Sequence, residues 1–385
     1  MIYQNKDKSI LPDAIQVRTL LNKMQDQTPV KHLMPTERVV DGDNKYFLTH
    51  LANGRFIIKP NITQQGVLYY GNSNGEEYKE HFKTKYYPSG NNVKKLHDEL
   101  MYHNVLLEQF ALLVKTFPLF KLLDEGIFIP ELDINFSLGN PYTLAAAYGL
   151  PSPFINLTAS KDVAMFYATN EYDADTGVYK PAKEGTLGIV YLYRITTPLG
   201  QTSELSTLGV QIFPRTFNTK QFSYVLGPGE EFNDKSNVFG LTFIQNNEAS
   251  KYYLDMFDGG KKLLPTNDIL TLKWNSIKDH IYQAAVDINL KKNPDDKRDD
   301  NIEALKKKIG RNITEGFPIF TKADLAHTDL ESIWNSFLEK IYPLNESDVK
   351  IVEYLKQLPS IEEYACYFNI ALIPQHYSLT LFISA

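Results

Sequence analysis

The stretch from Tyr142 to Thr197 constrains the fold of this chain more than any other part of the sequence. It contains a turn at Gly149-Leu150-Pro151, because glycine tolerates positive φ and proline fixes its own φ. The bulky residues 154–158 (FINLT) predict a short buried strand, and Ser160 is placed to cap the helix that follows. A second apolar strand is predicted over 185–196. A strand that leads directly into a capped helix is a common place for a ligand, since strand-end side chains and helix N–H groups converge there.

The pattern of apolar residues divides the whole chain into three parts. Residues 1–66 predict a small β-rich N-terminal annex, in which Asn53-Gly54 turns a hairpin. Residues 67–245 mix strand-like runs with one long helix, and residues 265–385 have mainly helical periodicity. We therefore predict an α+β fold with a small mixed sheet and helices, followed by a helical C-terminal subdomain.

Shorter patterns add detail to this prediction. The segment 121–140 is expected to be irregular, and the charged segment 291–301 is expected to be a solvated connector. Thr328 and Glu331 have the spacing of a capping box that opens a helix through Ile341. Further elements are predicted as strands over 209–213, 221–226 and 239–244, a helix over 345–358, and a strand-like final segment.

The long helix predicted from Val93 carries a regular apolar stripe that includes His103. The functional interpretation makes His103 a general base or a metal ligand. The structural interpretation makes it a core histidine with one hydrogen-bond partner. We favour the structural interpretation, because no second metal-type ligand is spaced with it, and we expect no metal site.

Composition excludes several classes of protein. The 385 residues carry a net charge of −6, which argues against broad binding to nucleic acid or to anionic membranes. Cys366 is the sole cysteine, so no internal disulfide is expected. The N-terminus lacks an apolar signal core and no run is long enough to span a membrane, so we expect a cytoplasmic protein. Motifs for phosphate loops, dinucleotide loops, serine hydrolases and zinc proteases are absent from the sequence.

The central stretch resembles the signature of the FRG domain. That signature usually reads H-Y-G-L-P-T-R-L-L-D-W-T, followed by a helix containing A-L-x-F-A, whereas this chain reads A-Y-G-L-P-S-P-F-I-N-L-T and then V-A-M-F-Y-A. The opening (F/Y)-R-G of the family is matched by Tyr69-Tyr70-Gly71. Between the two motifs the family has a long helix with an early acidic residue and a later phenylalanine, and Glu99 and Phe110 match these two positions. The resemblance covers roughly residues 62–245 and implies an α+β domain.

The chain departs from the family at most polar positions of this signature. Tyr70 and Pro153 stand where the family has arginines, Ala147 stands where it has histidine, and Asn156 where it has aspartate. Thr158 is retained. Loss of the arginine removes a cation that would pair with a diphosphate, and loss of the histidine and aspartate removes proton-transfer groups. The resemblance therefore implies a divergent member.

The same strand, threonine-containing turn and helix also resemble the core of ADP-ribosyltransferases. There, residues of two strands grip NAD, an aromatic ring stacks on the nicotinamide, and a Glu or Gln on a later strand acts on the ribose. The resemblance implies NAD as ligand or substrate, with no metal. Carried onto this chain, it implies Tyr69, Tyr70, Gly71, Asn156, Thr158 and Tyr167 as cofactor-binding residues and either Gln221 or Glu230 at the catalytic position.

Each of these residues also has a structural interpretation. Tyr70 can be a strand aromatic, Thr158 a residue that starts a helix, and Tyr167 a core ring. The sequence leaves both interpretations open for Tyr70 and Thr158. For Gln221 and Glu230 we favour the structural one, because a polar loop contains glutamate for many reasons.

Three classes of function remain open from the sequence. The first, which the lost polar positions favour, is a degenerate binding or sensor module with a pocket for NAD or ADP-ribose. The second is an active ADP-ribosyltransferase-type effector, such as a toxin or phage-defence protein, that modifies a macromolecule. The third is a scaffold whose helical C-terminal part binds a protein partner. No nucleic-acid or membrane partner is expected in any of the three.

Overall fold

A computed structural model describes most of this chain and has an α+β fold. The described residues are 11–25, 37–39, 46–50, 56–60, 67–79, 81–89, 92–120, 127–129, 134–136, 141–173, 176–195, 205–207, 212–294, 299–309, 313–326 and 328–341. The helix predicted over 345–358, the final strand-like segment and Cys366 lie outside these residues.

The main sheet has six strands in the order β11-β12-β7-β4-β10-β13, and every neighbouring pair is antiparallel. Its strands are β4 (Val67–Asn72), β7 (Phe154–Thr158), β10 (Leu187–Arg194), β11 (Leu205–Thr207), β12 (Gln221–Val225) and β13 (Val238–Ile244). Local sequence signals therefore predicted β4, β7, β10, β12 and β13 correctly. The strand predicted over 209–213 is wrong where it is described, because Ile212 and Phe213 form a bend before helix α6 (Pro214–Asn218).

A single residue pair joins the two halves of this sheet. Strands β4 and β7 are paired only through Tyr69 and Thr158. By contrast, β10 is paired with β13 over seven residues and with β4 over six. The sheet is thus two three-stranded halves, β11-β12-β7 and β4-β10-β13, that touch at the centre of the predicted motif.

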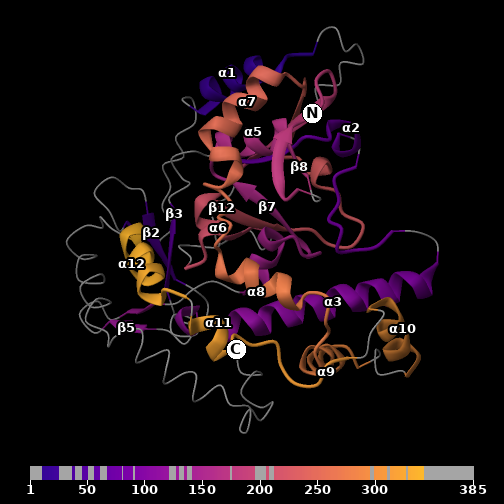
Figure 1. Cartoon of the computed structure of the whole chain (residues 1–385). Coiled ribbons are helices and arrows are strands. Elements are labelled where there is room, and N and C mark those ends of the chain that lie inside the picture. Colours follow the sequence, from indigo (N-terminus) through magenta and orange to yellow (C-terminus); the bar gives the residue numbers. More distant parts are fainter. Residues whose placement is uncertain are drawn as a thin grey trace.

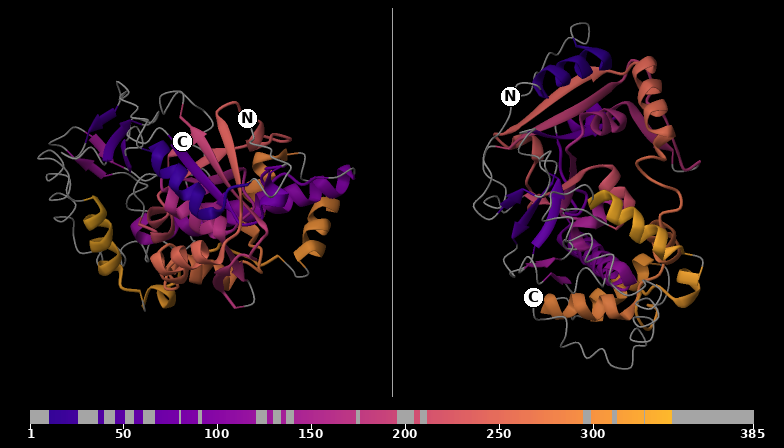
Figure 2. Two further views of the ribbon diagram at one scale, coloured as in Figure 1. Left: turned by 90° about the horizontal axis from the view of Figure 1, so that it is seen from above. Right: turned by 90° about the vertical axis from the view of Figure 1, so that its left-hand side faces the viewer.

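Helices α1 (Ala14–Gln25), α5 (Lys161–Thr169) and α7 (Asn247–Met256) cover one side of the β4-β10-β13 half. They share one apolar cluster with Val67 and Tyr69 of β4 and with Val190 and Leu192 of β10. Figure 1 shows these helices together at the top of the molecule, and the right-hand view of Figure 2 shows α1 on the outer side of the sheet. Ser160 caps α5 as predicted, since its hydroxyl accepts a hydrogen bond from the Val163 N–H.

A second and larger apolar cluster lies on the other side of β4 and β10. It contains Leu68 of β4, Tyr191 and Tyr193 of β10, and the buried face of helix α3 (Val93–Lys115). The 3₁₀ helix η3 (Pro141–Tyr148) and helices α8 (Ile269–Ile277) and α9 (Gln283–Lys292) pack on α3 in the same cluster. Figure 1 shows α3 as the long helix below the sheet, with α9 and α10 beside it.

His103 of α3 is a core histidine, as the structural interpretation predicted. Its ring is buried, and its Nδ1 lies 2.8 Å from the carbonyl oxygen of Tyr86, to which it donates. Burial lowers the pKa of His103, so its neutral form is favoured.

The remaining elements lie around these two layers. A five-stranded sheet has the order β1-β2-β3-β6-β5. Its strands β2 (Tyr46–His50) and β3 (Phe56–Pro60) are paired antiparallel, and the predicted Asn53-Gly54 turn between them lies outside the described residues. Its other strands are β1 (Glu37–Val39), β5 (Ile127–Ile129) and β6 (Ile134–Phe136), so the expectation that 121–140 is irregular is wrong for these last two. The two-stranded sheet β8 (Asn170–Asp173) and β9 (Val178–Pro181) follows α5, and short elements α2 (Gly75–Tyr78), η4 (Phe232–Asp234) and η5 (Asp258–Gly260) complete this part.

The part of the chain beyond residue 265 is helical where it is described. It contains α8, α9, α10 (Asp299–Ile309), α11 (Lys322–Ala326) and α12 (Leu330–Ile341).

Two details of the prediction for this helical part are wrong. Helix α10 already begins at Asp299, inside the predicted connector. Asp329 caps α12 by accepting a hydrogen bond from the Ser332 N–H, because its carboxylate directly precedes the first turn, whereas the Thr328 hydroxyl donates back to Asp324.

The absence of a side chain at Gly71 allows strand β4 to lie directly against helix α5. A Cβ atom at this position would fall well inside the van der Waals radius of the Ala164 carbonyl oxygen. Gly188 of β10 is similar, since its Cβ would lie 2.8 Å from the Ala168 carbonyl oxygen. The Tyr-Tyr-Gly motif is therefore a packing requirement of the strand–helix contact.

Replacing Gly71 by alanine should destabilise the protein strongly. The added methyl group meets backbone of α5, which cannot move away as a flexible side chain can, so we expect a loss of about 3 kcal/mol in the free energy of unfolding. Urea denaturation measures this loss. Gly227→Ala is the matched control, because its Cβ would have its nearest neighbour at 3.4 Å, and we expect a change within about 0.5 kcal/mol. Equal effects of the two substitutions would contradict the packing role.

Burial of tyrosine hydroxyls should make the fold sensitive to alkali. Burial raises the pKa of Tyr86 to about 12, and burial followed by the charge of Glu108 raises the pKa of Tyr142 to about 12. A raised pKa in the folded state means that stability is complete below about pH 10 and is lost as the pH rises toward 12. We expect the free energy of unfolding to fall by about 1 kcal/mol for each such tyrosine between about pH 9 and pH 11. Urea denaturation across this range, with tyrosinate absorbance recorded in parallel, provides the measurement, and a constant stability would contradict it.

Candidate functional site

Tyr70 and Thr158, both implied by the resemblance as cofactor-binding residues, lie on opposite sides of the sheet, so the prediction that they bind one ligand together is wrong. Cross-strand partners share one side, and the partner of Thr158 is Tyr69. Tyr70 packs instead on Tyr78 and Phe82, with ring centroids 6.2 and 4.4 Å away. The physical reason is the period of two along a strand, which sends neighbouring tyrosines in opposite directions.

The Thr158 hydroxyl is hydrogen-bonded to two backbone groups around it. It donates to the Thr219 carbonyl oxygen at 2.6 Å and accepts from the Ser160 N–H at 3.0 Å. Thr158 is 6% exposed. These bonds fix the end of β7, the turn before β12 and the start of α5 in one place, which agrees with the structural interpretation of Thr158.

Asn156 and Gln221 form a second polar contact on the same strands. The Gln221 side-chain amide donates to the Asn156 side-chain oxygen at 2.6 Å, and Gln221 is the cross-strand partner of Thr158. Further along β12, the Ser223 hydroxyl donates to the Thr143 carbonyl oxygen of η3 at 3.1 Å. Polar side chains of β7 and β12 thus hold neighbouring segments in place.

Glu230 lies at the other end of β12 from Gln221. Its carboxylate accepts a hydrogen bond from the Gly227 N–H at 2.8 Å and pairs with Lys235 at 3.0 Å. The Gly227 N–H, followed by Lys235, lowers the pKa of Glu230, so the carboxylate is ionised at neutral pH. Gln221 is the first residue of β12, and the four strand residues after it span about 13 Å before the Glu230 loop. The two alternative candidates for the catalytic position therefore lie at different ends of β12.

Tyr69, Gly71 and Tyr167 have mainly packing contacts. Tyr69 is 1% exposed inside the α1–α5–α7 cluster, and Gly71 lies against the backbone of α5. Tyr167 is half-buried on α5, with its ring 6.0 Å from that of Tyr179 in an edge-to-face arrangement. Of the predicted residues, Tyr69, Asn156, Thr158 and Gln221 are connected through strand pairing, whereas Tyr70 and Glu230 lie apart from them.

Arg215 of α6 is the polar residue near this motif that the sequence analysis missed. Its guanidinium lies 5.1 Å from the centre of the Tyr148 ring, and its Nη1 donates to the Ala147 carbonyl oxygen at 3.4 Å. Ala147 and Tyr148 occupy the first two positions of the FRG-like motif. The charge of Arg215 also acts on Tyr167 and Tyr179, where it opposes the rise in pKa that burial causes. The direct contacts of Arg215 in η3 are thus the Tyr148 ring and the Ala147 carbonyl.

Asp268 is the acidic neighbour of Arg215. Its Oδ2 lies 3.5 Å from Arg215 Nε, which is an ion-pair distance but not a hydrogen bond of normal geometry. The carboxylate is fully buried and caps α8, since it accepts from the Leu270 N–H at 3.2 Å and from the Thr271 hydroxyl at 2.8 Å. Burial is the main influence on the pKa of Asp268 and raises it. No local sequence signal joins Arg215 to Asp268, because 53 residues of chain separate them.

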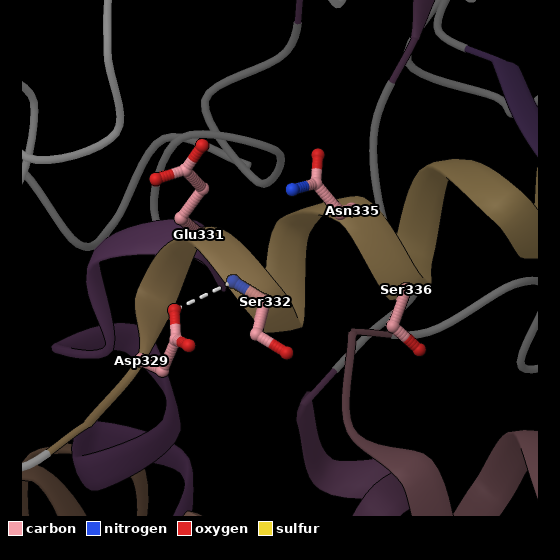
Figure 3. Close-up of a pocket in the computed structure, with 5 residues that line it drawn as sticks. All are labelled: Asp329, Glu331, Ser332, Asn335 and Ser336. Atoms are coloured by element: carbon pink, nitrogen blue, oxygen red, sulfur yellow. Dashed lines mark hydrogen bonds between the residues drawn. The ribbon is translucent and has the colours of Figure 1, made fainter.

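A pocket beside helix α12 is lined by none of the predicted or newly described site residues. It has a volume of about 330 Å³ and is lined by Asp329, Glu331, Ser332, Asn335 and Ser336 of α12 and its cap. Figure 3 shows that all five side chains belong to one helical segment, with the capping hydrogen bond between Asp329 and Ser332. A polar depression along a single helix has no convergent groups that would orient a ligand.

Comparisons with known proteins found no matching family model, curated protein or solved structure. None of the helices in the described part of the chain has the length and apolar content needed to cross a bilayer. Among the described residues, no three His, Cys, Asp or Glu side chains are grouped so that they could hold a metal ion.

Replacing Thr158 by valine should reduce stability. The substitution keeps the shape of the side chain but leaves the Thr219 carbonyl and the Ser160 N–H without their partner, so we expect a loss of about 2 kcal/mol in the free energy of unfolding. Urea denaturation measures the loss. Thr176→Val is the control, because Thr176 is exposed on the β8–β9 turn and should tolerate the change. A Thr158→Val variant with unchanged stability would contradict the structural role.

Proposed function

We propose that this chain is an FRG-like ligand-binding module that does not consume NAD. The contacts of the two alternative catalytic residues carry this proposal. Gln221 is bonded to Asn156, and Glu230 is bonded to Gly227 and paired with Lys235. An NAD-cleaving site needs a carboxylate or amide close to the ribose, where positive charge develops.

The position that the resemblance implies for NAD does not fit a dinucleotide. The space beside Gly71 is filled by the Ala164 carbonyl, and Tyr69 is buried among the helices of the outer layer. The Thr158 hydroxyl is buried, and its proton and one of its two lone pairs are already bonded to backbone groups. We therefore derive no reaction step through NAD at this position.

The way the FRG-like sequence motifs of this chain pack together supports the binding part of the proposal. The Tyr-Tyr-Gly strand lies beside the FINLT strand, and the helix after FINLT packs on the glycine of the first motif. The long helix predicted between the two motifs is present as α3 and packs on η3, which contains the start of the second motif. Motifs that pack together although their polar residues differ from the FRG signature are what a binding module derived from an enzyme-like domain would have.

Incubation with NAD should release no nicotinamide above background. The measurement is mass spectrometry of nicotinamide after a long incubation with excess protein. The reason is that Glu230, the one predicted carboxylate, is held by Gly227 and Lys235 at the far end of β12.

The control variants separate this outcome from the alternative of an active ADP-ribosyltransferase. Clear nicotinamide release by the wild-type chain that Glu230→Gln abolishes and Glu248→Gln leaves intact would overturn the proposal and make Glu230 catalytic. Glu248 is a suitable control because it is exposed in the first turn of α7.

A further inference from the structure

Helix α3 contacts both the main sheet and the C-terminal helices α8–α12. A single apolar cluster joins its side chains to Leu68 of β4 and Tyr191 of β10, and also to Trp274 of α8 and Val286 of α9. The Trp274 ring lies 5.4 Å from the Phe110 ring of α3, edge to face. Figure 1 shows α8 and α9 alongside α3. Within the described part of the chain, the C-terminal helices therefore have no apolar core of their own, which a separate domain would need.

A buried glutamine of α3 binds the backbone that joins α8 to α9. The Gln109 side-chain amide donates to the His280 carbonyl oxygen at 2.8 Å, and its side-chain oxygen accepts from the Tyr282 N–H at 3.0 Å. At the end of α3, the Thr116 hydroxyl accepts from the Phe320 N–H at 3.1 Å. An unpaired buried amide costs free energy, so α3 needs the C-terminal helices as partners for its polar groups as well as for its apolar ones.

The C-terminal helices also contact the 3₁₀ helix that carries the start of the FRG-like motif. Lys292 of α9 pairs with Glu108 of α3 at 2.5 Å and donates to the Tyr142 hydroxyl of η3 at 3.0 Å. The Tyr142 hydroxyl in turn donates to Glu108 at 2.7 Å. These three side chains connect α9, α3 and η3, so a displacement of α9 would remove contacts that position η3.

We propose that α8–α12 complete the core of the part that contains the FRG-like motifs and unfold together with it, with α3 as the common element. They are then not a separate subdomain that binds a partner. The proposal goes beyond the proposed function and does not depend on which ligand the module binds. Its consequence is that the apolar faces of α8 and α9 are used within the chain and are not available to a protein partner.

Urea denaturation of the full chain, followed by tryptophan fluorescence and by far-UV circular dichroism, tests the proposal. The two tryptophans of the chain, Trp274 and Trp334, are buried in α8 and α12, so their fluorescence reports the unfolding of the C-terminal helices. We expect a single transition with the same midpoint for both signals. Two separate transitions would overturn the proposal.

Gly71→Ala makes the test sharper, because Gly71 lies in β4 and its close contacts are with α5. We expect this substitution to lower the midpoint of tryptophan fluorescence as much as that of circular dichroism, by about 0.5 M urea or more. A fluorescence midpoint that stays at the wild-type value while the circular dichroism midpoint falls would overturn the proposal. Thr158→Val in β7 replaces Gly71→Ala as the decisive variant if the latter does not fold.

Gln109→Met tests α3 as the common element. It keeps the length of the side chain but leaves the His280 carbonyl and the Tyr282 N–H without their partner, so we expect both midpoints to fall together. Gln283→Met is the matched control, because Gln283 is exposed on α9 and should leave both midpoints unchanged. Wild-type midpoints for Gln109→Met would overturn the role of α3.

Discussion

The close contact between strand β4 and helix α5 is the constraint on which the rest of the structure depends. Gly71 of β4 and Gly188 of the neighbouring strand β10 have no side chain at the points where the carbonyl groups of Ala164 and Ala168 approach. The helix can therefore lie near the sheet, and its apolar side chains fill the outer cluster. Once α5 is seated in this way, the strand before it, β7, must end next to β4, and the single pair of Tyr69 and Thr158 follows. The main role of the residues that resemble the FRG signature is therefore to pack strand β4 against helix α5.

The sequence predicted the elements of this arrangement well because their signals are local. The glycine-proline turn, the β-branched strand and the serine cap each act within a few residues, and β7, α5 and β10 appear where they were expected. The five-stranded sheet was only partly predicted, since β5 and β6 are three residues long and too short for a periodic signal.

The candidate site could not be predicted to the same extent because it depends on register and long-range contacts. Which of two adjacent tyrosines faces Thr158 is decided by a pairing that no local pattern records. The use of the Thr158 hydroxyl depends on Thr219, and the neighbours of Arg215 come from η3 and from the cap of α8, both distant in sequence. A polar residue in a buried strand needs a partner, but its identity alone does not say whether that partner is backbone or ligand.

The order of strands in the main sheet also has a consequence for synthesis of the chain. Strand β4 pairs along most of its length with β10, which follows more than a hundred residues later, and Ile244 at the end of β13 is bridged to Asp13 before helix α1. During synthesis on the ribosome, the edge of strand β4 that pairs with β10 has no hydrogen-bonding partner until β10 has been made. Contacts that are so distant in sequence give slow folding, and an exposed strand edge attracts other chains in the meantime. Production of this protein should therefore depend on slow translation or on a chaperone that shields β4 until its partner arrives.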